Sequence, residues 1–407
     1  MKYKLPSVEY KGINLTKVIA IPSYGNFFSS IYKSLFTQYD LSNVSSNSDV
    51  IIVYSHSASK RADYDLIINT YMEALTNELA ELKVLKKIFN IKDKILFFKH
   101  LFFSLRDAKN FDIALIYKVK VAFLLARAKV NVDFADEVLK SRQFNVLVTF
   151  CDAFDIDNLL AQIAKKYGAI TATLQHGQYH ILDTDVPENL ALNNLVSDYL
   201  LSWGTATKTE NLSKCSNNTS VIPLGICDPE HSMTTPYLFE DKTKKNAIRI
   251  MLNADNCFEQ NIKMIKLALS FCRQNKLLFT IQFHPKNNKK KYLTTFADDT
   301  NYRSEINSSE ICFSITYTSG ALVKLLSKGE YFTLFKDEFT PNIFIDSLPF
   351  FEDQNGLESY FHSLSDITNA HVNAMTKAQS YFIANGDALI NNRLFIQKIL
   401  GEIKNVN

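Results

Sequence analysis

The sequence predicts an α/β protein of two doubly wound domains that face each other across a cleft, with a helical insertion in the first domain. Three observations predict this fold class. Residues 145–174 read as a strand, a helix and a second strand, which is a βαβ unit with a parallel sheet. A second series of alternating strands and helices begins near residue 244. Residues 60–143 contain no proline or glycine and repeat apolar residues every three or four positions, as helices do.

The individual elements follow from apolar runs bounded by polar residues, glycine or proline. In the first domain, strands are expected at 17–22, 50–54, 145–150 and 169–174, and helices at 27–38, 60–143 and 157–167. In the second domain, strands are expected at 247–252, 277–283 and 310–315, helices at 257–275, 320–327 and 366–400, and a further element at 331–335.

The domain limits follow from the length of the chain and from a polar stretch in its middle. The 407 residues are enough for two domains of roughly 150–200 residues each. Residues 213–220 are rich in Ser, Asn and Thr, and the stretch from there to Pro236 reads as a linker. We therefore expect a first domain at 1–235, a second domain at 236–385, and a C-terminal helix at 386–407 that can cross back to the first domain.

The composition excludes several classes of protein. The net charge is only +3, which is too small for a general nucleic-acid binder, so no nucleic-acid partner is expected. Six scattered cysteines form no CxxC pair, which argues against a disulfide framework or a structural zinc site and fits a reducing cytoplasm. We find no secretory segment at the start and no apolar run of 18 residues. We expect a cytoplasmic protein.

Polar residues that follow the first domain's strands are the first group of site candidates. Ligands of open α/β sheets bind outside the carboxyl ends of the strands. Asp152 follows one strand, and Gln175, His176 and Gly177 follow the next. His176 suits an acid or a base, and Asp152 is an alternative base, although either could be structural. The remaining candidates on this side are Gln175, Gly177, His180, Ser23 and Gly25.

The second domain repeats this arrangement. His284 precedes Pro285, which keeps it out of the helical conformation and holds it at the edge of the sheet. Hydroxyls and backbone N–H groups that open a helix bind phosphate, and Thr318 with its neighbours has this character, although a simple helix cap is the alternative. The candidates on this side are His284, Lys286, Thr318, Ser319, Gly320 and Asn253.

The order strand-QHG, strand-HP, strand-TSG-helix over about 145–330 resembles bacterial GT-B-fold transferases of cell-surface polysaccharides. These include CDP-glycerol glycerophosphotransferases of teichoic-acid synthesis, capsule Kdo transferases, and sialyl- and polysialyltransferases. The resemblance implies two Rossmann-like domains, with His284, Thr318 and Ser319 on the donor's phosphates and His176 near the acceptor. The other first-domain candidates are then expected on the acceptor side, and they are Gln175, Gly177, His180, Ser23 and Gly25. One departure is Lys324, which stands where many GT-B enzymes place a ribose-binding Glu.

The function expected from this resemblance is that of an inverting, metal-independent glycosyltransferase. It moves a sugar from a CMP-, CDP- or UDP-linked donor to a cell-surface polysaccharide or glycolipid, with no cofactor besides that donor. Metal independence follows because an imidazole, lysine and backbone amides can stabilise the departing nucleotide. The alternatives are a polyol-phosphate transferase of the teichoic-acid type, a UDP-sugar 2-epimerase, and a non-catalytic nucleotide-sugar-binding subunit.

A basic and aromatic region precedes the βαβ unit. Residues 83–130 hold 12 Lys or Arg against three acids, with eight Phe or Tyr between them. Such helices suit the anionic inner face of a membrane, which predicts a peripheral membrane contact. The alternative is that the aromatics are core and the lysines a solvated face.

Overall fold

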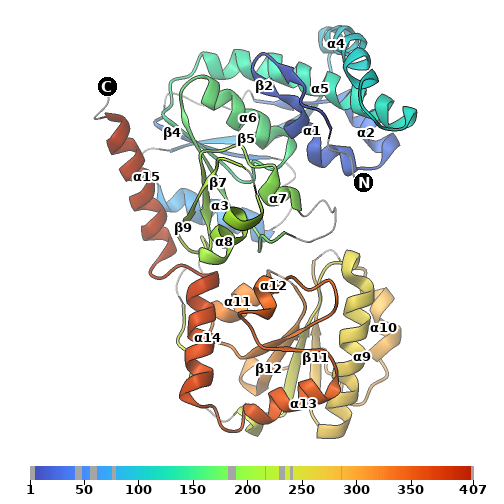
Figure 1. Cartoon of the computed structure of the whole chain (residues 1–407), viewed down its shortest axis with the longest axis vertical. Helices are drawn as coiled ribbons and strands as arrows, with labels where there is room; N and C mark the ends of the chain where they lie inside the picture. The colour runs from blue at the N-terminus through green and yellow to red at the C-terminus, as the bar shows by residue number, and fades with distance from the viewer. Residues whose placement is uncertain are drawn as a thin grey trace. The chain divides into compact units, whose positions relative to one another are not determined.

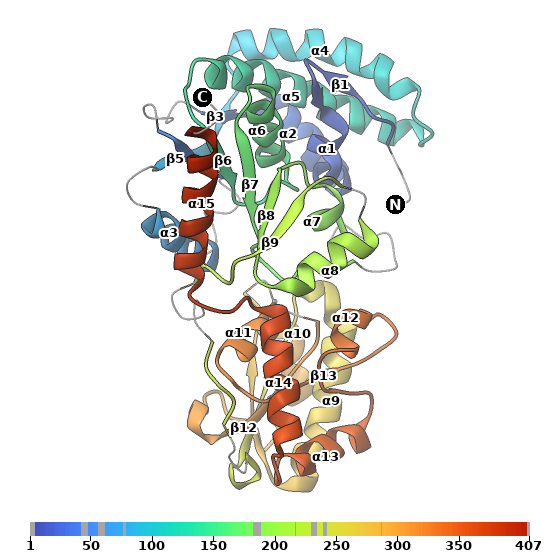
Figure 2. The same ribbon diagram turned by 60° about the vertical axis from the view of Figure 1, so that its left-hand side comes forward.

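The computed structural model describes residues 5–41, 48–55, 62–75, 79–181, 189–215, 217–228, 234–238, 242–285, 287–318 and 320–404. The chain forms two compact units (Figures 1 and 2). The first unit comprises Met1–Trp203, Thr207–Pro229 and Asp387–Asn407, and the second Gly204–Ala206 and Glu230–Gly386. The main boundaries between the units fall at 229/230 and 386/387, and the expected domain boundaries are 235/236 and 385/386.

The first unit is built on a seven-stranded sheet in the order β3-β5-β4-β6-β7-β8-β9. Neighbouring strands are parallel except β3 and β5. The sheet changes winding direction between β4 and β6, as in doubly wound folds. The strands are β3 (Thr37–Asp40), β4 (Val50–Ser55), β5 (Leu79–Ile88), β6 (Val146–Thr149), β7 (Ile170–Leu174), β8 (Tyr199–Ser202) and β9 (Ser220–Pro223). A small hairpin of β1 (Glu9–Tyr10) and β2 (Ile13–Asn14) precedes them.

Helices cover both faces of this sheet. Ile51 and Leu147 pack on one face with residues of α1, α5 and α6, while Ile52 and Val148 pack on the other with α3 and α15. Successive strand residues thus alternate between two apolar cores, which is why the buried strands read as continuous apolar runs. The helices are α1 (Leu15–Tyr24), α2 (Phe27–Phe36), α3 (Ala62–Ala74), α4 (Ile91–Lys109), α5 (Leu115–Lys140), α6 (Asp155–Lys166), α7 (Leu190–Asn193), α8 (Thr205–Lys214) and α15 (Ala388–Lys404).

The second unit holds a five-stranded parallel sheet in the order β11-β10-β12-β13-β14. Its winding direction changes between β10 and β12. The strands are β10 (Ala247–Met251), β11 (Leu278–Gln282), β12 (Ile311–Thr316), β13 (Phe332–Phe335) and β14 (Phe350–Phe351). The helices are α9 (Phe258–Asn275), α10 (Lys290–Phe296), α11 (Ala321–Ser327), α12 (Asn342–Ile345), α13 (Gln354–Ser363) and α14 (Asn369–Phe382). The predicted class, two doubly wound α/β domains, is confirmed.

Several local predictions are wrong. The expected strand at 17–22 belongs to helix α1, which the Asn14 side chain caps and which contains Pro22. Leu15, Val18 and Ile19 have helical spacing, and their burial on one face decides for the helix. The expected helix at 60–143 is interrupted by β5, whose Leu, Lys and Glu residues are helix formers. Pairing with β3 and β4 overrides that propensity.

Two further errors concern the linker and the last helix. The expected linker contains the end of α8 and strand β9, and the expected helix at 366–400 is two helices, α14 and α15. α15 packs its Ile396 and Ile399 into the core of the first unit beside α3 (Figures 1 and 2). The last helix of the chain therefore completes one face of the first sheet.

Candidate functional site

Asn253 and Thr318 lie where the winding of the second unit's sheet reverses. Met251 of β10 and Thr316 of β12 stand level in the sheet, so the residues that follow them are neighbours. Asn253 Nδ2 donates to the carbonyl of Thr318 at 3.0 Å and joins the two loops. Asn253 Oδ1 is buried and has no hydrogen-bond partner among the described residues. A buried acceptor without a partner at this position is suited to accept a hydrogen bond from a ligand.

A network of hydrogen bonds fixes the backbone of Asn253. Asn261 of α9 accepts from Asn253 N at 3.0 Å and donates to Asn253 O at 2.9 Å. The same Asn261 amide donates to Tyr292 Oη at 3.2 Å, and Tyr292 donates to Asp255 Oδ1 at 2.9 Å. Asp255 also accepts from Asn288 N at 3.2 Å. The loops that follow β10 and β11 are therefore bonded together, and both backbone groups of Asn253 are fixed.

His284 lies on the loop that this network holds. It follows β11, which pairs with β10, and Leu252 N donates to Gln282 O at 2.9 Å where the two strands end. A tight turn follows, in which Asn287 N donates to His284 O at 2.9 Å. The imidazole is half-buried. The structure thus brings Asn253, His284 and Thr318 to the ends of three adjacent strands of one sheet. Gly320 precedes α11, while Lys286 and Ser319 are outside the described residues.

In the first unit, His176 sits among aromatic rings at the end of β7. The ring centroids of Phe150, Tyr64, Tyr179 and Phe154 lie 5.0, 5.3, 5.5 and 5.8 Å from that of His176. Tyr179 Oη lies 2.7 Å from His176 Nδ1, so the two groups share a hydrogen bond. Packing and this bond together fix the plane of a half-buried imidazole. A fixed plane is what a residue needs to exchange a proton with a bound hydroxyl.

The hydroxyl of Tyr179 also contacts a thiol. Tyr179 Oη lies 3.7 Å from Cys151 Sγ at the end of β6. Burial raises the pKa of Tyr179 and that of Cys151 well above their usual values, so both groups keep their protons at neutral pH. A neutral Tyr179 can accept from Nδ1–H of His176, which leaves Nε2 as the basic nitrogen of the ring.

The side chain of Gln175 stabilises the turn that contains His176. Its Oε1 accepts from Trp203 N at 2.9 Å and from Thr207 Oγ1 at 3.0 Å, and its Nε2 donates to Gly177 O at 2.7 Å. The side chain is buried, and these bonds tie the His176 turn to the end of β8 and to α8. Gln175 was expected on the acceptor side, and this arrangement favours a positioning role.

Gly177 and His180 flank this turn differently. A Cβ added at Gly177 would meet no atom within 4 Å, so open space lies beside that backbone. Burial lowers the pKa of His180 to about 4, with a smaller effect from Lys214. His180 is therefore neutral at pH 7, which suits a structural imidazole better than a charged one.

Asp152 is completely buried. Its Oδ2 accepts from Val196 N at 2.9 Å and Ser197 N at 2.6 Å, and its backbone N–H donates to Thr173 Oγ1 at 3.0 Å. Burial raises the pKa of the carboxyl group, and the bonds from Ser197 and Val196 oppose that rise. The residue is 0% exposed, and its other carboxylate oxygen, Oδ1, is buried without a hydrogen-bond partner among the described residues, as Asn253 Oδ1 is. These contacts favour a role in holding the turn before β8.

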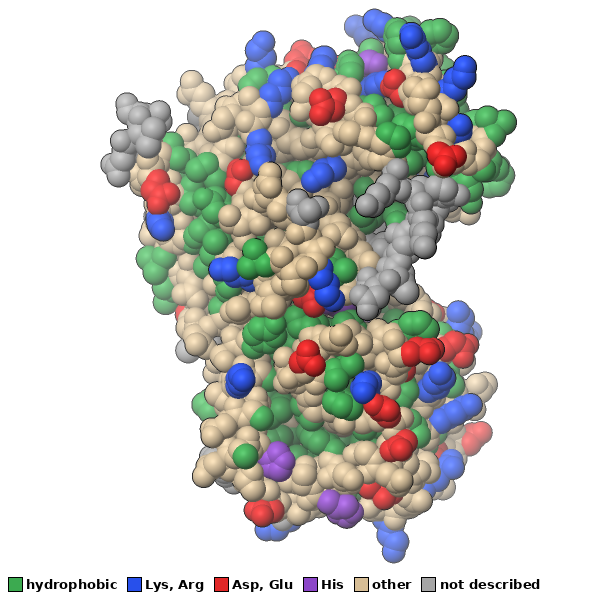
Figure 3. Space-filling model, in the orientation of Figure 1, with side chains coloured by type: hydrophobic (Ala, Val, Ile, Leu, Met, Phe, Trp, Pro, Cys, Tyr) green, Lys and Arg blue, Asp and Glu red, His purple; other side chains and the backbone are tan. Residues whose placement is uncertain are grey.

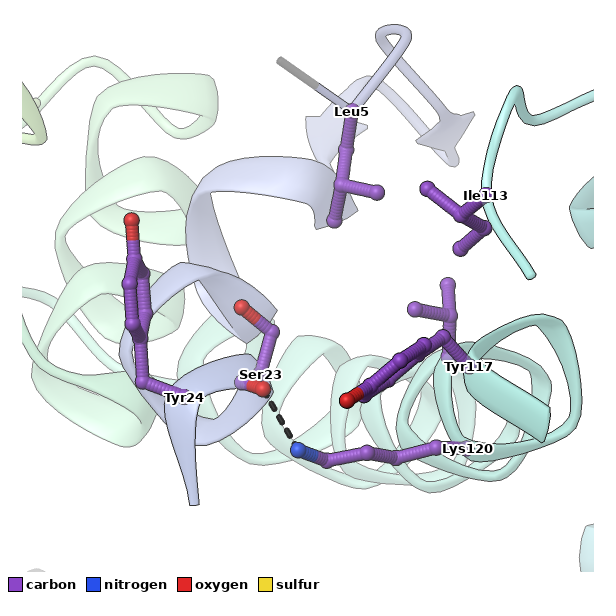
Figure 4. Close-up of a pocket in the computed structure, with 7 residues that line it drawn as sticks. Leu5, Ser23, Tyr24, Ile113, Tyr117 and Lys120 are labelled. Atoms are coloured by element: carbon purple, nitrogen blue, oxygen red, sulfur yellow. Dashed lines mark hydrogen bonds between the residues drawn. The ribbon is translucent and has the colours of Figure 1, made fainter. Parts of the chain in front are cut away.

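Ser23 and Gly25 are also expected on the acceptor side, but Ser23 lines a separate pocket and Gly25 lies beside it. Lys120 Nζ donates to both of their carbonyl oxygens at 2.5 Å, at the end of α1. Burial lowers the pKa of this lysine. Neither His176 nor Gln175 lines the pocket (Figure 4), which is formed by Leu5, Ser23, Tyr24, Ile113, Tyr117, Lys120 and Val121.

The described part of the chain contains no cluster of three His, Cys, Asp or Glu side chains that could hold a metal ion. Two carboxylates near the end of β6 are bonded within the first unit. Asp155 Oδ2 accepts from Tyr39 Oη at 2.5 Å, and Asp157 Oδ2 accepts from Cys151 N at 3.1 Å.

Sequence reasoning missed the residues that support the candidates. Asn261, Tyr292 and Asp255 hold the second-unit loops, and Tyr179 orients His176. One signal was available for Asn261, because it is a polar residue on the apolar, buried face of an amphipathic helix beside Met264 and Ile265. No comparable signal marks Tyr179 in the sequence.

Comparison with known proteins shows the fold. No protein-family model matches the chain, and no curated protein matches it in sequence. Among solved structures, S. aureus MnaA with UDP has a TM-score of 0.51 at 10% identity, covering 87% of this chain and 95% of that one. A protein of Listeria monocytogenes assigned as a UDP-N-acetylglucosamine 2-epimerase has a TM-score of 0.51 at 10% identity, covering 86% and 95%. The lipopolysaccharide outer core galactosyltransferase WaaB has a TM-score of 0.43 at 10% identity, covering 86% and 99%. The chain thus has the two-domain α/β fold of the GT-B type.

Proposed function

We propose that this chain is a glycosyltransferase that binds a nucleotide-activated sugar at the carboxyl edge of the second unit's sheet. The observation that carries the proposal is the bridge from Asn253 to Thr318 at the reversal of winding, with Asn253 Oδ1 buried and without a partner among the described residues. Nucleotides bind at this position in doubly wound sheets. The structure of MnaA, which has the same fold, contains UDP.

The second unit supplies groups for the donor. Asn253 Oδ1 accepts a hydrogen bond from the nucleoside part of the donor. The His284 imidazole and the Thr318 hydroxyl contact the phosphates of the donor. Lys286, Ser319 and Gly320 are expected to complete the phosphate contacts. Negative charge that develops on the departing nucleotide is stabilised by these donors, which need no reorganisation during the reaction.

The first unit supplies the base. His176 Nε2 takes the proton of an acceptor hydroxyl, whose oxygen forms a bond to the anomeric carbon as the bond from that carbon to the phosphate oxygen breaks. The nucleotide leaves with the electron pair, and the configuration inverts. Tyr179 holds the imidazole through Nδ1 during the transfer, and Gln175 holds the turn. The acceptor is a glycan or glycolipid of the cell surface.

The test is nucleotide binding by the whole purified chain. We expect at least one of UDP, CMP and CDP to raise the melting temperature. We expect Asn253→Leu to weaken that nucleotide at least about tenfold by calorimetry, since a buried bond to the ligand is lost. His284→Ala should lower turnover about 10²-fold or more. Asn369→Ala, at an exposed position of α14, is the control. No stabilisation by any nucleotide, or equal affinity in Asn253→Leu, would contradict the proposal.

A second candidate function is that of a UDP-sugar 2-epimerase. The shared fold with the Listeria monocytogenes protein favours it. The two functions differ in their need for an acceptor. Incubation with UDP-N-acetylglucosamine alone, followed by NMR, distinguishes them, because an epimerase interconverts the UDP-sugar when no acceptor is present. Incubation with CDP-glycerol and a glycan acceptor, compared with CDP-glycerol alone, tests transfer of a polyol phosphate.

A further inference from the structure

Helix α4 has an apolar face turned outward as well as one turned inward. Its inner side buries Phe97, His100, Ser104 and Ala108. Its outer side carries a row of large apolar side chains spaced four and three residues apart. All of this row is exposed, and it consists of Ile91, Ile95, Phe98, Phe102 and Leu105. Exposed apolar residues at this spacing form one continuous stripe along a helix of 19 residues, about 28 Å long.

The charged residues of α4 are divided between its two sides. Lys92, Lys99 and Arg106 are exposed and follow one another at seven-residue intervals, so they form a row along one flank of the stripe. The two acids of the helix are engaged elsewhere. Asp93 closes the capping box with Asn90, and Asp107 accepts from Lys129 Nζ of α5 at 2.7 Å. The outer side of α4 is therefore apolar and basic.

Helix α2 extends this surface. Phe28, Tyr32 and Phe36 are exposed at four-residue intervals, and α2 contains no acid. The Lys94 ammonium lies 5.9 Å from the centre of the Phe36 ring, and Phe89 N donates to Phe36 O, so the two rows adjoin. Figure 3 shows hydrophobic side chains at the upper right, over α4 and α2, together with Lys and Arg side chains and some Asp or Glu side chains. We call this surface the basic–apolar face. Its members are Phe28, Tyr32, Phe36, Ile91, Ile95, Phe98, Phe102 and Leu105, with Lys92, Lys99 and Arg106.

We propose that the basic–apolar face docks on an anionic lipid bilayer, with α4 lying in the plane of the headgroups. Side chains of the stripe enter the boundary between headgroups and acyl chains, while the basic row contacts lipid phosphates. Among the described residues, no helix combines the length and the apolar character that a membrane span requires. The proposal is independent of the reaction that the chain catalyses.

Charge decides between a bilayer and a second copy of the chain. A symmetric dimer brings a face against a copy of itself. The basic row would then meet another basic row, with no acid on the outer side of α4 or on α2 to compensate. Like charges that face each other at close range destabilise the contact between the two helices. An anionic surface offers the complementary charge.

Helix α4 is held firmly enough to present this face. His100 Nε2 lies 2.8 Å from Asp133 Oδ2 of α5, and Tyr10 Oη donates to Asp133 Oδ1 at 2.9 Å. Phe97 packs into a buried cluster with Phe89, Ala126 and Val130. Substitutions on the outer side leave these contacts intact, so they change the surface without unfolding the helix.

The test is flotation of the purified full chain with vesicles. We expect it to float with phosphatidylcholine containing about 30 mol% phosphatidylglycerol and not with phosphatidylcholine alone. The bound fraction should fall as NaCl rises from about 0.15 to 0.5 M. Lys92→Gln/Lys99→Gln/Arg106→Gln should weaken partitioning about a hundredfold, given the usual contribution of a basic residue at an anionic surface. Phe98→Ser/Phe102→Ser should weaken it at least about tenfold.

Matched variants control for charge and exposure. Lys263→Gln/Lys266→Gln/Lys377→Gln removes three exposed charges from the second unit. Leu212→Ser/Leu394→Ser changes side chains that are 73% and 57% exposed, against 58% and 73% for Phe98 and Phe102. Both controls should float like the unaltered chain, and all four should keep its melting temperature. Absence of flotation with anionic vesicles, or equal losses in variants and controls, would overturn the proposal. So would a dimer by light scattering that Phe98→Ser/Phe102→Ser dissociates.

Discussion

The two sheets position their candidate residues by different means. At the edge of the second unit's sheet, Asn261 and Tyr292 bond the loops to one another, and a buried acceptor on Asn253 is left over. At the edge of the first, aromatic rings surround His176, and the hydrogen bond with Tyr179 helps to fix its plane. Loops that hydrogen bonds hold together, with one buried acceptor left without a partner, are suited to bind a polar ligand. An oriented, half-buried imidazole is suited to exchange a proton.

The largest effect expected from this comparison is on turnover. His176→Ala should lower turnover about 10²- to 10⁴-fold, the usual contribution of a positioned base, while donor affinity stays within about twofold. The assay is transfer or donor consumption by the purified chain, with binding measured separately. His362→Ala, an exposed histidine of α13, is the control. If His176→Ala turned over normally, the proton-transfer role of the first unit would be wrong.

A smaller effect is expected from breaking the polar frame. Asn261→Ala leaves the N–H and carbonyl of Asn253 without their partners, which should lower the free energy of unfolding by about 2–3 kcal/mol. Nucleotide affinity should fall with it. Urea unfolding and calorimetry measure both quantities.

The control for Asn261 lies on the same helix. Asn275 Nδ2 donates to Phe271 O at a half-buried position, and Asn275→Ala should cost only about 0.5–1 kcal/mol. If both variants lowered the free energy of unfolding by the same amount, the two bonds from Asn261 to Asn253 would contribute no more than the single bond of Asn275, and the prediction would be contradicted.

The smallest effect expected is a loss of stability at acidic pH. Burial holds the pKa of His180 at about 4, below its value of about 6.5 in an unfolded chain. The unfolded state therefore binds a proton first as the pH falls, so stability is full above pH 6.5 and decreases toward pH 4. We expect the first unit to lose about 1–2 kcal/mol between pH 7 and 5. His180→Gln should have a shallower slope in urea unfolding, and an unchanged slope would contradict the prediction.

The elements that could be read from the sequence are those with one dominant signal. Strands β4 and β6 consist almost entirely of apolar residues because both of their faces are buried. The strand at Leu79–Ile88 has no such signal, since its residues also form helices well, and only its two partner strands decide its structure. Likewise, 15–24 has apolar spacing compatible with either element, and packing against α5 and α6 selects the helix.

The candidate site divides in the same way. The positions of His176, His284, Asn253 and Thr318 after strands could be predicted, because parallel strands end at one edge of a sheet. The engagement of Asp152 and Gln175 could not. Asp152 bonds to Val196, 44 positions along the chain, and Gln175 bonds to Trp203, 28 positions along. No local pattern reveals such partners.

The sequence by itself determined that strands alternate with helices and which polar residues follow each strand, because burial and backbone geometry leave periodic traces in the order of residues. Only the tertiary structure decided which of those polar groups bond within the chain and which remain available to a ligand. A hydrogen bond depends on distance in space, and the partners of Asn253, Asp152 and Gln175 come from distant parts of the sequence.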